Sequence, residues 1–328
     1  MPAEGPKKHH YVPQTYLRAF SDATGRLYSY RKDDPGNPHL THIRNVAAEN
    51  YYYAQPTPDG GRNLDALEKA FGEIESGWPE IVAILSKGQQ LASSNLDTFY
   101  QFLGLMRVRG PASRDAIELT MAEQVRSLGR MLEKRGELPP KPASMEEALA
   151  FDNLQISIDP HQSLHMMPAV MVGFGKVLHV LGFSIIRNKT DISLLTSDNP
   201  VIYFDPSMPE ATVRPYAIEN GPPVELLFPL SPSLLLIGHS DWAGPKGHTY
   251  LRFVTCSDKQ IIRRANRFIA RFGYNSVFSP DRSSDKLIAK WAHESPISKT
   301  VTFPTSDGEI TVSQTVFGQR PTKPKWRN

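Results

Sequence analysis

Cysteine is nearly absent from this chain, because Cys256 is the only one among 328 residues. A single cysteine excludes an internal disulfide and a zinc site built from several cysteines. Its neighbours are Thr255 and Ser257, and no histidine lies close to it in the sequence. We therefore expect a buried, unreactive thiol and not a nucleophile.

Long hydrophobic runs are missing as well. No apolar stretch approaches the roughly 20 residues of a membrane helix, and the N-terminus lacks the apolar segment of a signal peptide. We therefore expect a cytoplasmic protein without a membrane partner. The formal net charge is only +3. This charge permits a nucleic-acid partner without demanding one, since a uniformly basic binder would carry more positive charge.

Several motifs of known enzymes are also absent. The chain has no phosphate-binding Gly-x-x-x-x-Gly-Lys loop, no dinucleotide-binding glycine fingerprint, no kinase motifs and no Gly-x-Ser-x-Gly elbow. Nucleotide hydrolysis by a P-loop, hydride transfer and serine-hydrolase chemistry are therefore all disfavoured.

The most informative segment that is present covers residues 9–20 and has the sequence His-His-Tyr-Val-Pro-Gln-Thr-Tyr-Leu-Arg-Ala-Phe. Pro13 suits the first turn of a helix. Three apolar residues follow at helical spacing, namely Tyr16, Leu17 and Phe20. We expect a short helix packed on the core, with three candidate site residues at its entrance: His9, His10 and Gln14. A pair of adjacent histidines is, however, more often a feature of the surface or of a helix cap than a metal site.

Hydrophobic periodicity describes the first two thirds of the chain. Residues 26–31 alternate as a strand, a turn is expected at 34–38, and extended segments are expected at 42–46 and 51–54. Together they predict a small N-terminal sheet or hairpin. Apolar residues at helical spacing then predict four helices, at 63–85, 93–110, 112–134 and 159–181. A proline-rich loop or linker at 135–144 separates the last two.

From residue 183 onward, short apolar runs between turn residues predict strands at 183–187, 192–196, 201–204, 224–228, 234–237 and 251–254. Two more helices are expected at 257–272 and 285–293, and a last hairpin joins 299–303 to 309–312. The fold class is therefore α+β, with a small N-terminal sheet, a helical middle and a mostly antiparallel C-terminal sheet packed by one or two helices. We expect one large domain over residues 1–318, with sub-regions 1–62, 63–182 and 183–318, and a mobile basic tail at 319–328.

Two further segments combine histidine or carboxylate side chains in patterns that favour chemistry. His161 and His165 share one face of an expected helix, but Gln162 stands where a metalloprotease has glutamate. The two histidines could still bind one metal ion, but the pattern is more typical of His165 facing the core and His161 facing solvent. An apolar strand also ends in Thr-Ser-Asp-Asn-Pro at 196–200. This segment is either a tight corner or a place where Asp198 enters a site.

Positive charge gathers on two helices. Arg107 and Arg109 lie at the end of an expected helix, where they complement the helix dipole. A later helix carries a stripe of three arginines, at 264, 267 and 271. Such a stripe is typical of a solvated face, and it would also suit phosphate contacts.

The chain resembles a widespread, mostly bacterial family of unknown function that also occurs in phages and fungi. The resemblance rests on the signature at 9–20 and on Thr-Ser-Asp-Asn-Pro at 196–200. Weaker matches lie at 45–49, Glu68 or Glu75, 107–111, His165, 229–232, Asn266 and 277–279. Phe183 stands where members often have tryptophan. The resemblance implies that these polar groups form one constellation, but it brings no reaction with it.

This inventory suits phosphodiester chemistry, in which histidine transfers protons, carboxylates bind a metal and arginine binds phosphate. Our leading hypothesis is a hydrolase acting on phosphodiesters, specifically a nuclease of phage defence or a toxin, with RNA or DNA as its partner. The candidate catalytic residues are His9, His10, Gln14, Arg109, His165, Asp198 and Asn199. The candidate ligands of a divalent metal are Glu49, Glu75 and Asp198.

Two other hypotheses stay open. The first is a non-catalytic module that binds a nucleotide, a nucleic-acid end or a peptide with the same polar groups. The second is a structural protein in which the polar groups form a satisfied buried network. The sequence leaves the substrate and the oligomeric state open.

Overall fold

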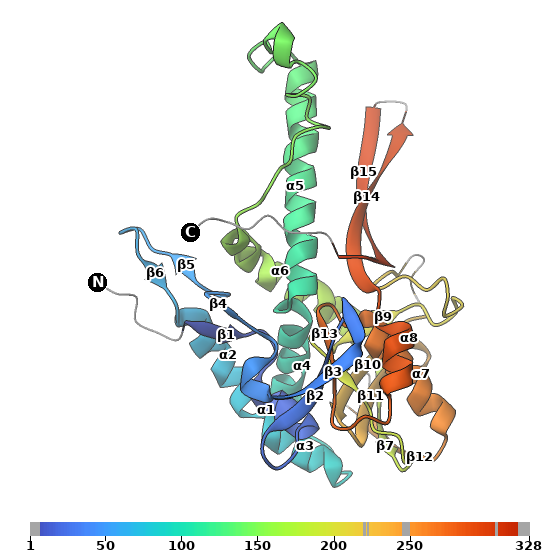
Figure 1. Ribbon diagram of the computed structural model, residues 1–328. Coiled ribbons are helices and arrows are strands. Elements are labelled where there is room, and N and C mark those ends of the chain that lie inside the picture. The colour runs from blue at the N-terminus through green and yellow to red at the C-terminus, as the bar shows by residue number, and fades with distance from the viewer. Residues whose placement is uncertain (1–6, 219–220, 222, 245–249, 306–307, 321–328) are drawn as a thin grey trace.

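The structure is a computed structural model that describes residues 7–218, 221, 223–244, 250–305 and 308–320 (Figure 1). Its centre is a five-stranded sheet with the order β12-β7-β11-β10-β9. These strands are Leu251–Cys256, Gly182–Asn188, Leu234–His239, Glu225–Ser231 and Ile202–Phe204. The β12–β7 pair is parallel and the other three pairs are antiparallel. The predicted α+β class and the mostly antiparallel C-terminal sheet are thus confirmed.

Both faces of this sheet are covered. Along β10, Leu226 and Phe228 belong to one hydrophobic cluster and Leu227 to the other, as the alternation of a strand requires. The first cluster includes α1, α3, α4 and α6 (Gln14–Leu17, Trp78–Ser86, Ser93–Val108 and Pro160–His179). The second includes α7 (Lys259–Phe272) and α8 (Asp285–Trp291). Both clusters draw residues from the N-terminal and the C-terminal parts of the chain.

The short N-terminal helix is packed on the core as the sequence predicts. Tyr16 is fully buried, and its ring stacks on Phe228 of β10 with a centroid distance of 5.4 Å. Its hydroxyl donates to the carbonyl of Pro229 at 2.7 Å and lies 2.6 Å from the hydroxyl of Thr196. A buried tyrosine needs such a partner. Helix α1 therefore connects the start of the chain to the segment that follows residue 195.

A second sheet has the order β3-β2-β13-β8 and combines distant parts of the chain. Its strands are Asp34–His42, Arg26–Arg31, Ser276–Ser279 and Thr196–Ser197. The turn predicted at 34–38 was wrong, since β3 begins at residue 34. Pro35 and Pro38 are tolerated there because β3 is an edge strand.

Three other predicted extended segments are absent or shortened. In the segment expected at 42–46, residues 43–45 form one turn of 3-10 helix. Residues 192–195 do not pair with a strand, because the side chain of Asn266 accepts from the amide of Leu195 at 2.9 Å and donates to the carbonyl of Ser193 at 2.8 Å. Residues 51–53 form a turn. The strand next to them is β4 (Ala48–Asn50), which pairs with β1 (Lys8–His10).

The predicted helix at 63–85 is divided at Gly77 into α2 (Ala66–Ser76) and α3. Pro79 explains the division, because a proline is accepted in the first turn of a helix but not in its interior. The remaining helix of the middle region, α5, covers Pro111–Lys134. A short pair, β5 and β6 (Gln55–Pro56 and Arg62–Asn63), precedes α2. No helix in the described part of the chain is both long enough and apolar enough to cross a membrane.

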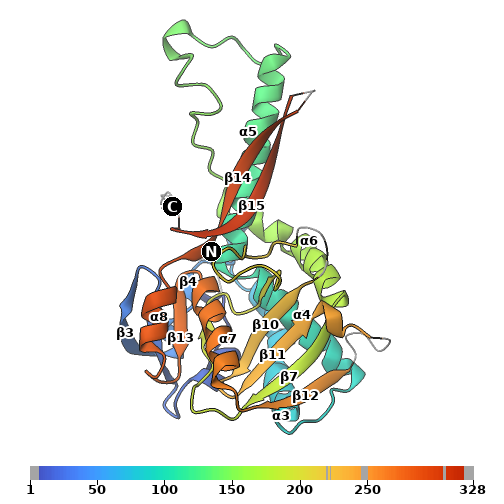
Figure 2. The same cartoon turned by 90° about the vertical axis from the view of Figure 1, so that its right-hand side faces the viewer.

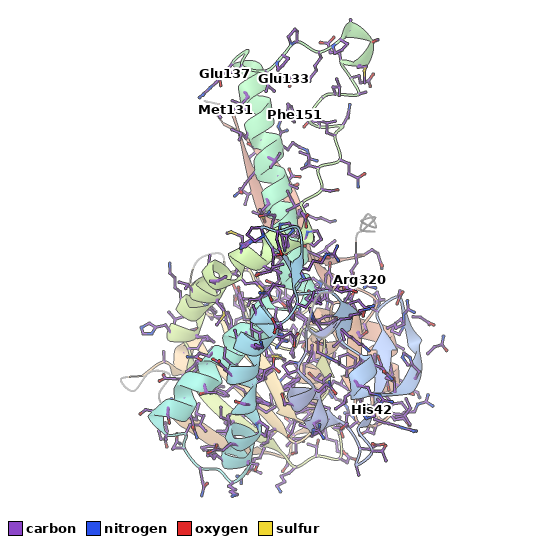
Figure 3. All side chains as sticks on the ribbon, turned by 90° about the vertical axis from the view of Figure 1, so that its left-hand side faces the viewer. His42, Met131, Glu133, Glu137, Phe151 and Arg320 are labelled. Carbon is purple, nitrogen blue, oxygen red and sulfur yellow. The ribbon has the colours of Figure 1, made fainter. Side chains whose placement is uncertain are left out.

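The outer half of α5 and the hairpin β14–β15 (Ser295–Thr305 and Gly308–Gly318) project from the body in the same direction (Figures 1 and 2). The hairpin is longer than the sequence predicts, and residues 306–307 of its expected turn lie outside the described residues. Met131 and Phe151 lie along this projection, whereas Arg320 lies where the projection joins the body (Figure 3). Residues 321–328 of the expected tail also lie outside the described residues.

Candidate functional site

The first predicted site residues lie in a closed polar cluster, which we call the Arg109 cluster: His9, Tyr53, Glu75 and Arg109. The Arg109 side chain is 1% exposed. Its guanidinium donates to the Glu75 carboxylate, to the hydroxyl of Tyr53 at 3.0 Å and to the carbonyl of His10 at 2.5 Å. Burial opposes the charge, but Tyr53 and Glu75 raise the pKa of Arg109 above its usual range. This arginine holds protein groups and does not face a cleft.

The two histidines of the signature differ. His9 is fully buried, and its Nδ1 accepts from the backbone amide of Tyr53 at 2.9 Å. His10 is partly exposed, and its Nε2 lies 3.2 Å from the carbonyl of Arg44. Burial lowers the pKa of His10, which favours the neutral ring. Gln14 is partly exposed at the first position of α1.

Asp198 is a positioning residue in this structure. It is 1% exposed, and its two carboxylate oxygens accept from the backbone amides of Tyr274 and Asn275, each at 2.7 Å. Its own amide donates to the carbonyl of Ser276 at 3.1 Å. Burial raises the pKa of the carboxyl, and these hydrogen bonds oppose the rise. The carboxylate therefore fixes the backbone of residues 274–276.

Asn199 has an equally local function. Its side-chain amide donates to the carbonyl of Phe272 at 2.8 Å and to the hydroxyl of Tyr216 at 2.6 Å. These contacts attach the Thr-Ser-Asp-Asn-Pro segment to the end of α7. The motif thus forms the tight corner that was one of its two sequence interpretations.

The predicted metal ligands are not brought together. Glu49 is exposed in β4 opposite His9, Glu75 pairs with Arg109, and Asp198 binds backbone amides. Within the described ranges, no three His, Cys, Asp or Glu side chains form a group that could hold a metal ion. His165 is exposed on α6, with its ring centroid 6.3 Å from that of His161. His165 therefore does not occupy the core position predicted for it.

The arginine stripe of α7 is paired with carboxylates. Arg264 pairs with Glu225 and Arg267 with Glu210, at 2.5 Å and 2.7 Å, and Arg271 pairs with Glu294 at 3.3 Å. Because each positive charge has a carboxylate partner, the stripe is not an unbalanced phosphate-binding surface.

An open pocket of about 350 Å³ lies beside the N-terminal segment, at Tyr11. We call it the polar pocket. Its walls come from Tyr11, from residues 45–48, from Asn275 and Ser276, and from Arg320. Strands β2 and β3 and the turn between them complete it with four more polar residues: Ser29, Arg31, Asp33 and His39. Segments that are far apart in the sequence therefore meet at this pocket.

The backbone holds the first two walls together. The amide of Tyr11 donates to the carbonyl of Ala47 at 2.9 Å, and Ala47 has a φ of 50°. A positive φ is uncommon for a residue other than glycine, and it occurs where the surrounding structure enforces it. Burial, and then the nearby Asp198 carboxylate, raise the pKa of Tyr11. Its phenol therefore faces the pocket as a neutral hydroxyl.

The pocket carries more positive than negative side chains. Arg320 donates to the side-chain oxygen of Asn275, which Asp198 positions through the backbone. Arg31 pairs with Asp33 at 2.7 Å, but its side chain is 65% exposed and keeps donors that face solvent. His39 is exposed as well. No sequence pattern pointed to Arg31, His39 or Arg320, because only the folded chain brings them beside Tyr11.

A buried lysine lies behind the wall of this pocket. Lys32 is 3% exposed, and its Nζ donates to the carbonyls of Ala270 and Arg271 at 2.7 Å and 3.0 Å. These are among the last carbonyls of α7, which have no partner within the helix. Burial lowers the pKa of Lys32 to about 7, although the Asp198 carboxylate opposes the shift.

The fold and the pocket together define an α+β protein with an open polar pocket. Comparison with protein families assigns residues 8–283 to a family described as a protein of unknown function, DUF4238. The match spans most of the chain, so the chain belongs to this family. No curated protein and no solved structure matches it.

Proposed function

We propose that the chain is a cytoplasmic binding module whose polar pocket binds the phosphate of a nucleotide or of a nucleic-acid end. One observation carries the proposal: two segments that carry the family resemblance line this pocket, and a third holds part of its wall in place. Tyr11 comes from the first signature and residues 45–48 from a second segment. Asp198, from the Thr-Ser-Asp-Asn-Pro motif, fixes the backbone of Asn275 and Ser276.

The chemistry of the lining residues supports a phosphate ligand. Arg320 donates to Asn275 through one nitrogen and keeps further donors for phosphate oxygens. The exposed Arg31 binds Asp33 through Nε and one Nη and keeps its other Nη for a ligand. Asn45, Ser29 and Ser276 supply neutral hydrogen-bonding groups, which suit the hydroxyls and base edges of a nucleotide. A volume of about 350 Å³ is within the range of small-molecule sites.

Binding is favoured over the phosphodiester hydrolysis of our leading sequence hypothesis. His9, Arg109 and Asp198 are at most 1% exposed and hold other protein groups. A general acid, a general base or a metal must instead reach the substrate. These three side chains therefore hold the fold, and Asp198 also holds the pocket wall, rather than taking part in a reaction.

The test is the affinity for nucleoside monophosphates and inorganic phosphate, measured by calorimetry. Arg320→Gln and Arg31→Gln should each weaken binding by about tenfold or more, because a hydrogen bond to a charged group contributes about 1.5–3 kcal/mol. Arg282→Gln is the matched control. Arg282 is 60% exposed and pairs with Asp285 much as Arg31 pairs with Asp33, but it lies outside the pocket.

If the wild-type chain binds none of these ligands, or if both pocket variants bind as well as the wild type, the proposal is wrong. Chromatography of the incubated ligands and of RNA or DNA provides the second readout. Turnover that persists in the pocket variants would replace the binding module by a hydrolase with another site.

A further inference from the structure

A second pocket lies next to the polar pocket. It has a volume of about 290 Å³ and is lined by Ala211, Arg271, Lys290, Trp291, His293 and Glu294. We call it the tryptophan pocket. Trp291 ends α8 and is partly exposed, while part of its ring packs on the second hydrophobic cluster. The pocket therefore presents an indole whose position the core fixes.

Basic groups surround this indole. The Lys290 ammonium lies 5.6 Å from the centroid of the Trp291 ring, and the Lys290 side chain is exposed. His293 is exposed as well. Arg271 is held by Glu294 at 3.3 Å and by the carbonyl of Glu210 at 2.6 Å. An aromatic surface beside exposed basic side chains is the combination that binds unpaired nucleotides, because each base has a π-face and each phosphate a negative charge.

Two consecutive residues connect the pockets. The side chain of Gln319 donates to the carbonyl of His293 at 3.0 Å, at the rim of the tryptophan pocket. Arg320, the next residue, lines the polar pocket and donates to Asn275. Consecutive Cα atoms are about 3.8 Å apart, so the two pockets lie on either side of one short segment. Charged residues of both pockets also lie near one buried group, because Arg320, Glu294 and Arg271 all influence the pKa of Lys32.

We propose that the ligand is a single-stranded nucleic acid that occupies both pockets. Its phosphate is bound by Arg31 and Arg320 in the polar pocket, and the base of a neighbouring nucleotide stacks on Trp291. Lys290 faces the phosphate between them. This inference rests on the proposed phosphate site and adds the class of ligand. A duplex does not suit the geometry, because its bases are stacked on each other and are not available to the indole.

The experiment compares thymidine monophosphate with a short single-stranded oligothymidylate that carries a phosphate at one end and a fluorophore at the other. The affinity is measured for two oligonucleotides that carry the phosphate at opposite ends, and for a duplex of the same length. The wild-type chain should bind one of the two oligonucleotides about tenfold more tightly than the monophosphate, since base stacking on an aromatic side chain contributes about 1–3 kcal/mol. The duplex should bind more weakly than that single strand.

Trp291→Ala should abolish the advantage of the oligonucleotide and leave the affinity for the monophosphate unchanged. Trp291→Phe should retain most of the advantage. Trp242→Ala is the matched control, since Trp242 is also partly exposed but lies outside both pockets. Lys290→Gln removes an exposed charge without touching the core. It should weaken oligonucleotide binding several-fold and reduce its salt dependence.

The outcomes separate the two proposals. If the wild type binds the monophosphate but no oligonucleotide more tightly, the second pocket is not part of the site and the phosphate site stands. The same holds if both Trp291→Ala and Lys290→Gln bind the oligonucleotide like the wild type. A duplex that binds as tightly as the single strand contradicts the single-strand assignment. If neither ligand binds, the proposed function fails together with the inference.

Discussion

The Arg109 cluster and the polar pocket both take residues from the same N-terminal segment, and they differ in access to solvent. His9 points into the cluster and is fully buried, whereas Tyr11, two residues later, lines the open pocket. Both regions are rich in polar groups. In the cluster the donors of Arg109 are directed at protein acceptors, but in the pocket Arg31 and His39 keep exposed donors. A dense group of polar residues is thus a site only where some of them remain available.

The comparison predicts its largest effect for Arg109→Gln. Removing one partner of a buried ion pair leaves the other charge uncompensated, so the free energy of unfolding should fall by about 3–5 kcal/mol. Glu75, which is 19% exposed, and the carbonyl of His10 would lose their donors. Urea denaturation measures the loss, and phosphate binding of the remaining folded protein should be unchanged.

Arg282→Gln is the control for this measurement too, with an expected change of at most about 0.5 kcal/mol. A stable Arg109→Gln protein that no longer binds phosphate would reverse the comparison, because the closed cluster would then be the functional site.

A smaller effect is expected for Asp198→Asn, which should change both properties. The new amide group has only one oxygen for the two backbone amides of Tyr274 and Asn275. An unsatisfied buried donor costs about 1–3 kcal/mol, and relaxation of the backbone should also weaken phosphate binding. The matched control is Asp22→Asn, because Asp22 also accepts from backbone amides but is exposed.

If Asp198→Asn loses stability while its phosphate affinity stays that of the wild type, Asp198 does not position the pocket. Stability and affinity should therefore fall together in this variant. In Arg109→Gln only stability should fall, and in Arg320→Gln only affinity.

Sequence reasoning predicted the helices and strands that have strong hydrophobic periodicity. It also singled out the motifs at 9–20 and 196–200 as candidate site segments. Helix α5 and strand β7 lie close to their expected positions because local spacing defines them. The strand expected at 192–196 is reduced to its last residue because Asn266, which is distant in sequence, takes the hydrogen bonds of residues 193 and 195. Solvent access escapes sequence reasoning in a similar way, because residue type does not encode it. Asp198 has the chemistry of a catalytic acid, but its oxygens accept from backbone amides 76 and 77 residues away.

The last prediction concerns pH and compares two buried cations. Arg109 stays charged in the folded and unfolded states. Lys32 has its pKa lowered by burial to about 7, against 10.5 for an ordinary lysine. The folded state therefore binds fewer protons than the unfolded state between these values, and stability should rise with pH across this window, by at most about 1.4 kcal/mol per pH unit. The contribution is lost as pH falls through the folded pKa.

Lys32→Met removes the titrating amine, so the free energy of unfolding of the wild type, minus that of the variant, should increase from about pH 7 to pH 10. Arg109→Gln should show no such difference in slope from the wild type, because the guanidinium does not titrate there. Parallel pH curves for wild type and Lys32→Met would mean that Lys32 keeps its charge behind the pocket. The polar pocket would then have a permanent positive charge behind its wall, as the Arg109 cluster has in Arg109. The two regions would in that case differ only in their access to solvent.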